Sequence, residues 1–295
     1  MGRDLYELPP PRQPRAETGM SRRALLRLRL TERARADIDY AGVTDRVRAG
    51  WERDGYEPLL RALEPVATEL VEAAAVGGGS RVLDAGAGDG NVARAALSRA
   101  AVVEACDLSP VMVARGRAAC PGAEWAVADV QALPYPDESF DAVLSSFAAV
   151  LAPRAMGTAR ELLRVARPGG AVVLTAWVPR GLPGRFAELA EQQVPLPYGV
   201  PSPADWGRQE IVRRRLEPQV EELEIRLRTV RIEFPGAEAL FDALARPAGL
   251  TDRDRSIVRP EFDRLLASCN ADPAAVRLDA RYLLITGRRT SAAQS

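Results

Sequence analysis

Apolar and polar positions follow two different periods between residues 81 and 177. Short apolar runs predict strands at RVLDA (81–85), VVEACD (102–107), EWAVAD (124–129), DAVLSS (141–146) and AVVLTAW (171–177). Between these runs, apolar residues at helical spacing predict helices over 91–100, 109–117 and 155–165. Because short strands that alternate with helices are typical of parallel strands joined by right-handed crossovers, this part of the chain predicts a doubly wound α/β sheet.

The chain before the first strand is predicted to be helical, with a polar arm in front. Residues 1–20 combine prolines with charges and have too little apolar surface to fold alone, so we expect a flexible arm. The paired arginines in SRRALLRLRL (21–30) lack the apolar segment and cleavage site of an export signal, and therefore predict a surface helix. Apolar residues recur at helical spacing from Tyr56 to Val71, and the glycines at 77–79 end that helix. We therefore expect N-terminal helices over 21–76.

After Trp177 the alternation ends, and prolines and glycines become frequent. The tetrapeptide RPGG (167–170) is expected to be the turn that leads into the fifth strand. Two long β-like runs at 222–234 and 280–289 predict further strands, and the segment between them is mostly helical. We therefore expect a seven-stranded Rossmann-like sheet with a core over 77–180, followed by a region over 181–295 that supplies a helical cap and the final strands.

Composition narrows the class of protein. The 295 residues are 47% hydrophobic and 27% charged, and no apolar run reaches membrane-span length, so no membrane association is expected. Three cysteines are too few for a disulfide framework and indicate a reducing compartment, so we expect a cytoplasmic protein. The formal net charge of zero disfavours nucleic acid as a partner. The chain has no histidine, so the usual metal ligand and the usual general base are both missing, and we expect no metal.

The first predicted strand ends in a glycine-rich loop, VLDAGAGDGN (82–91). Loops at this place bind ligands in doubly wound sheets. A dinucleotide site would have a third glycine where Asn91 stands, and the carboxylates of Asp84 and Asp89 would repel a pyrophosphate. A ligand with an ammonium and a sulfonium group, such as S-adenosylmethionine, would be attracted instead. Asp89 has a second interpretation, because aspartate is also common as the N-cap of a helix such as the one that begins near Asn91.

Two further carboxylates end neighbouring strands of the predicted sheet. Asp107 closes the second strand, where it can accept hydrogen bonds from both hydroxyls of a ribose. Asp129 closes the third strand, where its side chain can accept from an adenine amino group while the backbone of Val130 meets the ring. The carboxyl ends of three strands therefore predict a nucleoside site.

Several stretches in order along the chain resemble the class I S-adenosylmethionine-dependent methyltransferases. They are VLDAGAGDG, CDLSPVMVARGR, ADVQALPYPDESFDAV and LLRVARPGGAVVLTAW, which span roughly Arg81 to Trp177. The chain is most similar to the group of ubiquinone and menaquinone C-methyltransferases, known as methyltransferase type 11. The resemblance implies S-adenosylmethionine as cofactor, S-adenosylhomocysteine as product, and N-terminal helices that cover the cofactor.

The resemblance also implies which residues bind the cofactor. The methionine end would be lined by Asp84, Ala85, Gly86 and Gly88, and the ribose would be bound by Asp107. The adenine would be contacted by Leu108, Met112, Asp129 and Val130, with Ser146 and Phe147 near the sulfonium. Trp51 and Tyr56 would either close over the cofactor or fasten the N-terminal helices.

The sequence says less about the methyl acceptor, although the residues at the end of the fourth strand exclude some methylation reactions. The residues there read Ser145-Ser146-Phe147-Ala148, which is neither the Asn/Asp-Pro-Pro-Tyr of amino-group methylation nor the Pro-Cys of cytosine methylation. We therefore expect direct in-line displacement that depends on alignment and dehydration of the reactants. If a base is used, Tyr40, Tyr198 and Asp205 are candidates by location alone.

Three functions stay open at this point. The first is methylation of carbon or oxygen in a small molecule, for example in secondary or quinone-like metabolism. The second is methylation of RNA or protein, for which the arginine-rich N-terminal segment could supply a surface. The third is binding of the cofactor for a different activity, because a fold does not determine its chemistry. A homodimer is also left open.

Overall fold

The computed structural model describes residues 38–269 and 272–291, and the chain from Asp39 onward forms one compact unit. The arm expected over residues 1–20 and the helix expected over 21–30 lie outside the described residues. None of the helices in the described part is both long and apolar enough to cross a membrane.

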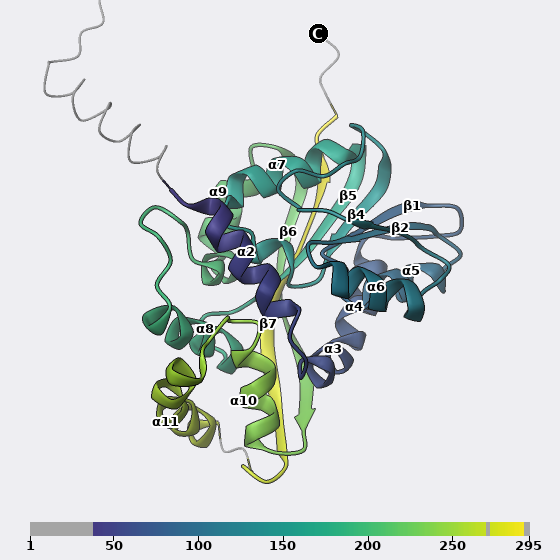
Figure 1. Cartoon of the computed structure of the whole chain (residues 1–295). Helices are drawn as coiled ribbons and strands as arrows, with labels where there is room; N and C mark the ends of the chain where they lie inside the picture. The colour runs from purple at the N-terminus through teal and green to yellow at the C-terminus, as the bar shows by residue number, and fades with distance from the viewer. Residues whose placement is uncertain (1–37, 270–271, 292–295) are drawn as a thin grey trace, which may run out of the picture. The chain divides into compact units, whose positions relative to one another are not determined.

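A seven-stranded mixed sheet runs through this unit (Figure 1). Its strands are β1 (Arg81–Ala85), β2 (Val102–Asp107), β3 (Glu124–Val127), β4 (Phe140–Ser145), β5 (Ala166–Trp177), β6 (Val220–Phe234) and β7 (Val276–Arg289). The order is β3-β2-β1-β4-β5-β7-β6, in which the first five strands are parallel and β7 is antiparallel to both of its neighbours. The doubly wound fold expected from the sequence is therefore confirmed.

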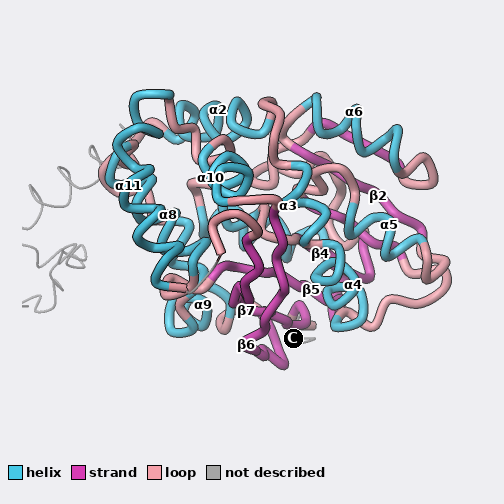
Figure 2. Tube along the Cα trace, turned by 90° about the horizontal axis from the view of Figure 1, so that it is seen from below, coloured by secondary structure: helices cyan, strands magenta, loops and turns pink. Residues whose placement is uncertain are grey.

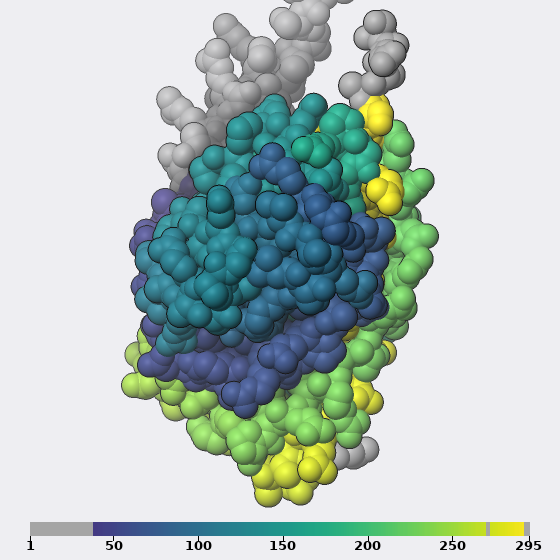
Figure 3. Space-filling model, turned by 90° about the vertical axis from the view of Figure 1, so that its right-hand side faces the viewer, coloured from purple at the N-terminus to yellow at the C-terminus, as the bar shows by residue number. Residues whose placement is uncertain are grey.

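Helices cover both faces of the sheet because the strands are buried on both sides. One face packs against α4 (Glu64–Ala73), α5 (Asn91–Leu97) and α6 (Pro110–Ala119), and the other packs against α7 (Ala155–Val165) and α9 (Gln209–Leu216). Along β1, Val82 belongs to the first core and Leu83 to the second, and both are fully buried. In Figure 3, blue and teal segments from the first half of the chain form one side of the molecule, with green segments from the second half along one edge.

The cap expected after the fifth strand is built from two insertions. Between β5 and β6 lie α8 (Leu182–Gln193), the 3-10 helix η2 (Pro203–Gly207) and α9, and between β6 and β7 lie α10 (Ala237–Ala245) and α11 (Asp252–Ser268). The rings of Phe186, Phe241 and Phe262 meet with centroids 5.1–5.9 Å apart and join α8, α10 and α11. In Figure 2 these helices lie beside the long β6–β7 ribbon, with α2 (Tyr40–Trp51) next to α10.

The helix expected from Tyr56 to Val71 is two helices, α3 (Glu57–Ala62) and α4, with Leu63 between them. The break has a local cause in Pro65, which has no N–H to donate to the carbonyl of Arg61 and whose ring clashes with that carbonyl in a continuous helix. The apolar spacing was therefore read correctly, but the single helix was wrong.

The RPGG turn is also different from the expectation. Strand β5 already begins at Ala166, which pairs with Phe140, and the next pair along the ladder is Ala142 with Ala171. Residues 167–170 therefore form a bulge opposite Asp141, in which Gly169 takes a positive φ of 73°. The guanidinium of Arg167 binds the Asp141 carboxylate at 2.6 Å, so the irregular segment is held inside the sheet.

Candidate functional site

A cavity of about 330 Å³ opens at the carboxyl ends of the parallel strands. It lies where the chain order reverses between β1 and β4, which is the usual ligand position in a doubly wound sheet. The predicted cofactor residues that line it are Asp84, Gly86, Gly88, Asp107, Leu108, Met112, Asp129, Val130, Ser146 and Phe147. Ala85 differs from these, because it is fully buried inside β1 and is not part of the wall.

The glycines of the loop after β1 have positive φ values and serve two purposes. At Gly86, with φ of 74°, a Cβ atom would lie 2.3 Å from the Cβ of Ala148, so the loop packs directly on the segment after β4. At Gly88, with φ of 58°, a Cβ would have only the Leu60 side chain near it, at 4.0 Å. Gly86 therefore permits close packing, whereas Gly88 leaves open space in the cavity wall.

Asp107 holds this loop in place. Its Oδ2 accepts a hydrogen bond from the backbone N–H of Gly88 at 2.9 Å, and its Oδ1 accepts from the N–H of Ser109 at 2.9 Å. Burial raises the pKa of the Asp107 carboxyl above its ordinary value, and the backbone hydrogen bonds oppose this shift. Each carboxylate oxygen can accept more than one hydrogen bond, so Asp107 retains acceptor capacity toward the cavity.

Two buried carboxylate oxygens beside the loop lack partners among the described residues. Asp84 Oδ2 accepts from the backbone N–H of Ala93 at 2.9 Å, but Asp84 Oδ1 and Asp89 Oδ1 have no hydrogen-bond partner there. Burial raises the pKa of Asp84 to about 7 and also raises the pKa of Asp89. Unpaired buried carboxylates are costly, so this end of the cavity suits a ligand that brings a positive charge and hydrogen-bond donors. An ammonium and a sulfonium fit these residues.

The interpretation of Asp89 as a helix cap is wrong. The N-cap of α5 is Gly90, with φ of 94°, and no side chain caps that end of the helix. The Asp89 side chain lines the cavity instead. The sequence correctly places a carboxylate in this loop, but it could not decide between the two uses, because a shift of one residue moves the cap from Asp89 to Gly90.

Residues expected around the adenine are tied to the N-terminal helices. Met112 is buried, and its sulfur accepts a hydrogen bond from the Tyr56 hydroxyl at 3.4 Å. The Asp129 carboxylate accepts from the backbone and side-chain N–H groups of Gln131, at 2.8 and 2.9 Å. The Gln131 amide also donates to Thr44 on α2 at 3.2 Å. Helix α2 is thereby attached to the end of the cavity where the adenine is expected.

The sequence left two uses open for Trp51 and Tyr56, and the structure places the two side chains differently. Trp51 lines the cavity and packs edge-on against Tyr56 at 5.4 Å, whereas Tyr56 is buried behind it and is not part of the wall. The Tyr56 hydroxyl accepts from the guanidinium of Arg115 on α6, which also binds Asp54 at 2.6 Å and Glu57 at 2.9 Å. Burial raises the pKa of Tyr56 to about 12, so the phenol remains a neutral hydrogen-bonding group near pH 7.

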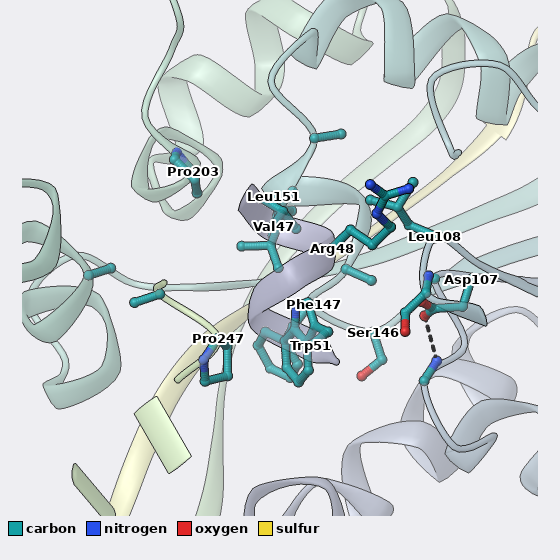
Figure 4. A pocket seen from close by; sticks show the side chains of 18 of the residues that line it. Val47, Arg48, Trp51, Asp107, Leu108, Ser146, Phe147, Leu151, Pro203 and Pro247 are labelled. Atoms are coloured by element: carbon teal, nitrogen blue, oxygen red, sulfur yellow. Dashed lines mark hydrogen bonds between the residues drawn. The ribbon is translucent and has the colours of Figure 1, made fainter. Parts of the chain in front are cut away.

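The other half of the cavity is mainly apolar. Figure 4 shows Asp107, Leu108 and Ser146 at one side, Pro203 and Pro247 at the other, and residues of α2 between them. Phe147 stacks on Trp177 with ring centroids 4.1 Å apart and forms part of the boundary between the halves. The apolar wall comes from Val43, Val47, Trp51, Val150, Leu151, Trp177, Pro183, Phe186, Ala187, Ala190, Val194, Leu196, Pro203, Ala204, Ala243, Leu244, Pro247 and Ala248.

The structure does not bring the three candidate bases to this cavity. The Arg154 guanidinium lies 4.8 Å from the centre of the Tyr40 ring, and Tyr198 is 93% exposed. Asp205 lies 3.7 Å from Arg208 and 3.8 Å from Arg215. None of the three lines the wall in the described part of the chain, so their catalytic role stays a prediction without geometric support.

Sequence reasoning missed Trp177 and Glu191, which do line the cavity. Trp177 was recognised only as the end of a strand. Glu191 lies on α8, whose wall residues are at 183, 184, 186, 187, 190 and 191, with Val194 just after the helix. This helical spacing was a usable signal.

Known proteins are similar to this chain in both sequence and fold. A family model described as a methyltransferase domain matches residues 83–174. An uncharacterized protein of Mycobacterium tuberculosis is 32% identical over 256 residues, which cover 82% of this chain and 93% of that protein. A malonyl-[acyl-carrier protein] O-methyltransferase of Halorhodospira halophila is 38% identical over 152 residues, or 48% of each chain.

Solved structures agree with this assignment at the level of the fold. The crystal structure of a Bacillus halodurans protein with a provisional methyltransferase assignment is similar with a TM-score of 0.56 and 21% identity. The match covers 76% of this chain and 99% of that one. The glycine loop, the strand order and the relatives lead to one conclusion. The chain belongs to the class I S-adenosylmethionine-dependent methyltransferases.

Proposed function

We propose that the cavity binds S-adenosylmethionine at the glycine loop and a small, mainly apolar acceptor in the half lined by α2, α8, η2 and α10. One observation carries the proposal: a single cavity joins unpaired buried carboxylate oxygens at one end to an apolar chamber at the other. A cationic cofactor matches the first part, and an apolar acceptor matches the second.

Cofactor binding is assigned to carboxylate oxygens of this chain that can accept hydrogen bonds. The ammonium group is expected at the free Oδ1 atoms of Asp84 and Asp89, and the ribose hydroxyls at Asp107. Asp129, Val130, Leu108 and Met112 surround the expected adenine position. The open space at Gly88 supports this assignment, because it lets the backbone approach a ligand without a side chain in between.

The acceptor is proposed from the walls of the second half. Nearly all of its lining side chains are aliphatic or aromatic, so binding an apolar molecule would release water from them. The Halorhodospira relative methylates malonyl-[acyl-carrier protein], but that match covers about half of each chain and does not carry its acceptor over. We propose methylation of carbon or oxygen in a small molecule, with a quinone-like compound as one member of that class.

The mechanism follows from the surroundings of the two ligands. S-adenosylmethionine supplies a methyl group on a positively charged sulfur. The chain holds both reactants in one enclosed space, and alignment of this kind can lower a barrier by roughly 7 to 11 kcal/mol. Phe147, stacked on Trp177 and fixed by a 2.9 Å hydrogen bond from its backbone N–H to Thr175, excludes water between the halves.

The test begins with calorimetric titration of the purified protein with S-adenosylmethionine and S-adenosylhomocysteine, with NAD as the control ligand. We expect saturable binding of both sulfur ligands and loss of both in Asp107→Ala. Mass spectrometry would then identify acceptors that gain a methyl group. Binding of NAD alone, or unchanged binding in the variant, would contradict the site assignment.

Two alternatives have their own readouts. Methylation of RNA would be indicated by RNA binding that weakens steeply as salt rises, because phosphate contacts release counterions. The homodimer left open by the sequence would be recognised from the molar mass in solution.

A further inference from the structure

The apolar half of the cavity contains one carboxylate, Glu191. Among the residues that the structure describes, the other acidic residues of the wall, at 84, 89, 107 and 129, all lie in the glycine loop or at the strand ends. Glu191 instead belongs to α8, whose other wall residues are apolar or small. A charged group in such a wall calls for a reason, because burial penalises it unless a partner is present.

Glu191 is held in a defined orientation. The Ser202 hydroxyl donates to its carboxylate at 2.6 Å, and the same hydroxyl oxygen accepts from the N–H of Ala204 at the start of η2. Glu191 is thereby tied to the segment that precedes Pro203, which lies opposite Asp107 and Ser146 in Figure 4. Glu191 therefore belongs to a part of the cavity wall that is remote from the glycine loop.

The surroundings of Glu191 favour a positive charge. Burial raises its pKa above the ordinary value, and the carboxylates of Asp205 and Glu188 raise it further, while the Ser202 hydroxyl opposes the shift. Arg208 lies 3.7 Å from Asp205 and 3.8 Å from Glu188, so that cation is shared between its two neighbours. No ion pair to Glu191 occurs within the described ranges, so a cationic ligand group would complete its surroundings.

We propose that Glu191 binds a protonated amine on the acceptor, whose remaining body lies against the apolar wall. This inference rests on the proposed function, because it assigns one end of the same cavity to the acceptor. The amine would be anchored away from the cofactor, so the methylated atom is a different part of the molecule. Glu191 is thus a specificity-determining residue for an apolar acceptor that carries a basic group.

The competing feature is Arg46, which lines the cavity from α2 and has no ion-pair partner within the described part of the chain. Arg48 also lines the cavity, but it pairs with Asp45 at 2.9 Å. If Arg46 dominated recognition, the acceptor would carry a carboxylate instead of an amine. The test must therefore compare both charges on the same apolar body.

The experiment titrates octylamine, octanol and octanoate into the full-length protein at pH 8 in the presence of saturating S-adenosylhomocysteine. We expect octylamine to bind most tightly. Glu191→Gln keeps the size of the side chain and an acceptor for Ser202, and should weaken octylamine binding roughly tenfold while octanol binding changes less than about threefold. Glu210→Gln, at an exposed position of α9 and outside the wall, should behave as the wild type.

The other outcomes overturn the inference in separable ways. Octylamine binding that is equal in wild type and Glu191→Gln, tightest binding of octanoate, or equal weakening of octanol and octylamine would each remove the amine assignment. Failure of all three probes to bind while S-adenosylhomocysteine still binds would also contradict it. Failure of S-adenosylhomocysteine itself to bind would instead remove the proposed function on which the inference rests.

Discussion

The carboxylate of Asp107 accepts a hydrogen bond from the backbone N–H of Gly88 at 2.9 Å. This contact joins the end of β2 to the loop after β1, so the residue proposed to bind the ribose also fixes the loop proposed to approach the cofactor. The loop is therefore set before a ligand arrives, and preorganisation of this kind reduces the entropy lost on binding.

The space at Gly88 gives the first prediction. In Gly88→Ala the new methyl group meets no protein atom closer than 4.0 Å, so the chain should fold, with a modest cost from the positive φ of about 1 to 2 kcal/mol. The methyl group would occupy the open space in the cavity wall, and we expect at least a tenfold loss of S-adenosylhomocysteine affinity. Calorimetry and a thermal melt measure the two effects.

Gly169→Ala is the matched control for this variant. Gly169 also has a positive φ, of 73°, and a Cβ there would meet nothing within 4 Å, but it lies in the β5 bulge away from the cavity. It should lower the melting temperature by a similar amount and leave ligand affinity unchanged. Equal affinity loss in both variants would show that backbone strain, and not the filled space, is responsible.

The half of the cavity at the glycine loop could be predicted from the sequence because its determinants are local. Asp107 is the last residue of β2, Asp84 is next to last in β1, and Asp129 lies two residues after β3, which ends earlier than expected, at Val127. Parallel strands bring these carboxyl ends to one edge. The break between α3 and α4 was also visible in the chain, as Pro65, but the apolar spacing outweighed it. Sequence patterns therefore sufficed where the position of a side chain depends on residues adjacent to it in the chain.

The apolar half of the cavity could not be predicted, because it is assembled from distant segments. Its wall combines Val47 of α2, Phe186 of α8 and Leu244 of α10, which are separated by more than fifty residues in each step. Only the packing of the cap brings them together, and no local motif encodes that packing. For the same reason Tyr198 and Asp205, chosen by position in the chain, lie outside the cavity wall.

Asp84 predicts a pH dependence with a definite sign. Its pKa is about 7 in the folded protein and 3.8 as the reference value, so the folded state holds the proton more tightly. The contribution of the Asp84 carboxyl to the free energy of unfolding is therefore most favourable below about pH 4, and it declines as the pH rises to about 7. Asp84→Asn cannot ionise, so its melting temperature relative to wild type should increase between pH 4 and pH 8.

As the pH rises, the affinity for the cofactor should increase, whereas the contribution of Asp84 to folding stability decreases. The ionised Asp84 carboxylate is proposed to attract the ammonium group, so wild-type affinity for S-adenosylhomocysteine should rise as pH increases through about 7. The affinity of Asp84→Asn should be lower at pH 8 and should follow this rise only weakly. Parallel pH profiles in the two proteins would mean that another group controls binding.

Tyr56 predicts a link between α6 and the N-terminal helices. Tyr56→Phe removes a buried hydroxyl that donates to Met112 and accepts from Arg115, at a cost of roughly 0.5 to 1.5 kcal/mol. Arg115 keeps its bonds to Asp54 and Glu57, so the fold should survive with a melting temperature a few degrees lower. We expect faster dissociation of S-adenosylhomocysteine in stopped-flow fluorescence, whereas Tyr198→Phe, at an exposed ring, should change neither quantity.

Trp177 lines the apolar half of the cavity and supports the ring of Phe147. In Trp177→Ala, Phe147 loses the ring on which it stacks at 4.1 Å, although its backbone bond to Thr175 remains. The apolar chamber should therefore lose a wall while the glycine loop is unaffected, so octanol affinity should fall roughly tenfold and S-adenosylhomocysteine affinity should stay within about threefold. Trp177→Phe keeps an aromatic surface for Phe147 and should restore most of the octanol binding. If both ligands weaken together in Trp177→Ala, the two halves do not act as separate sites, and the assignment of the chamber to the acceptor fails.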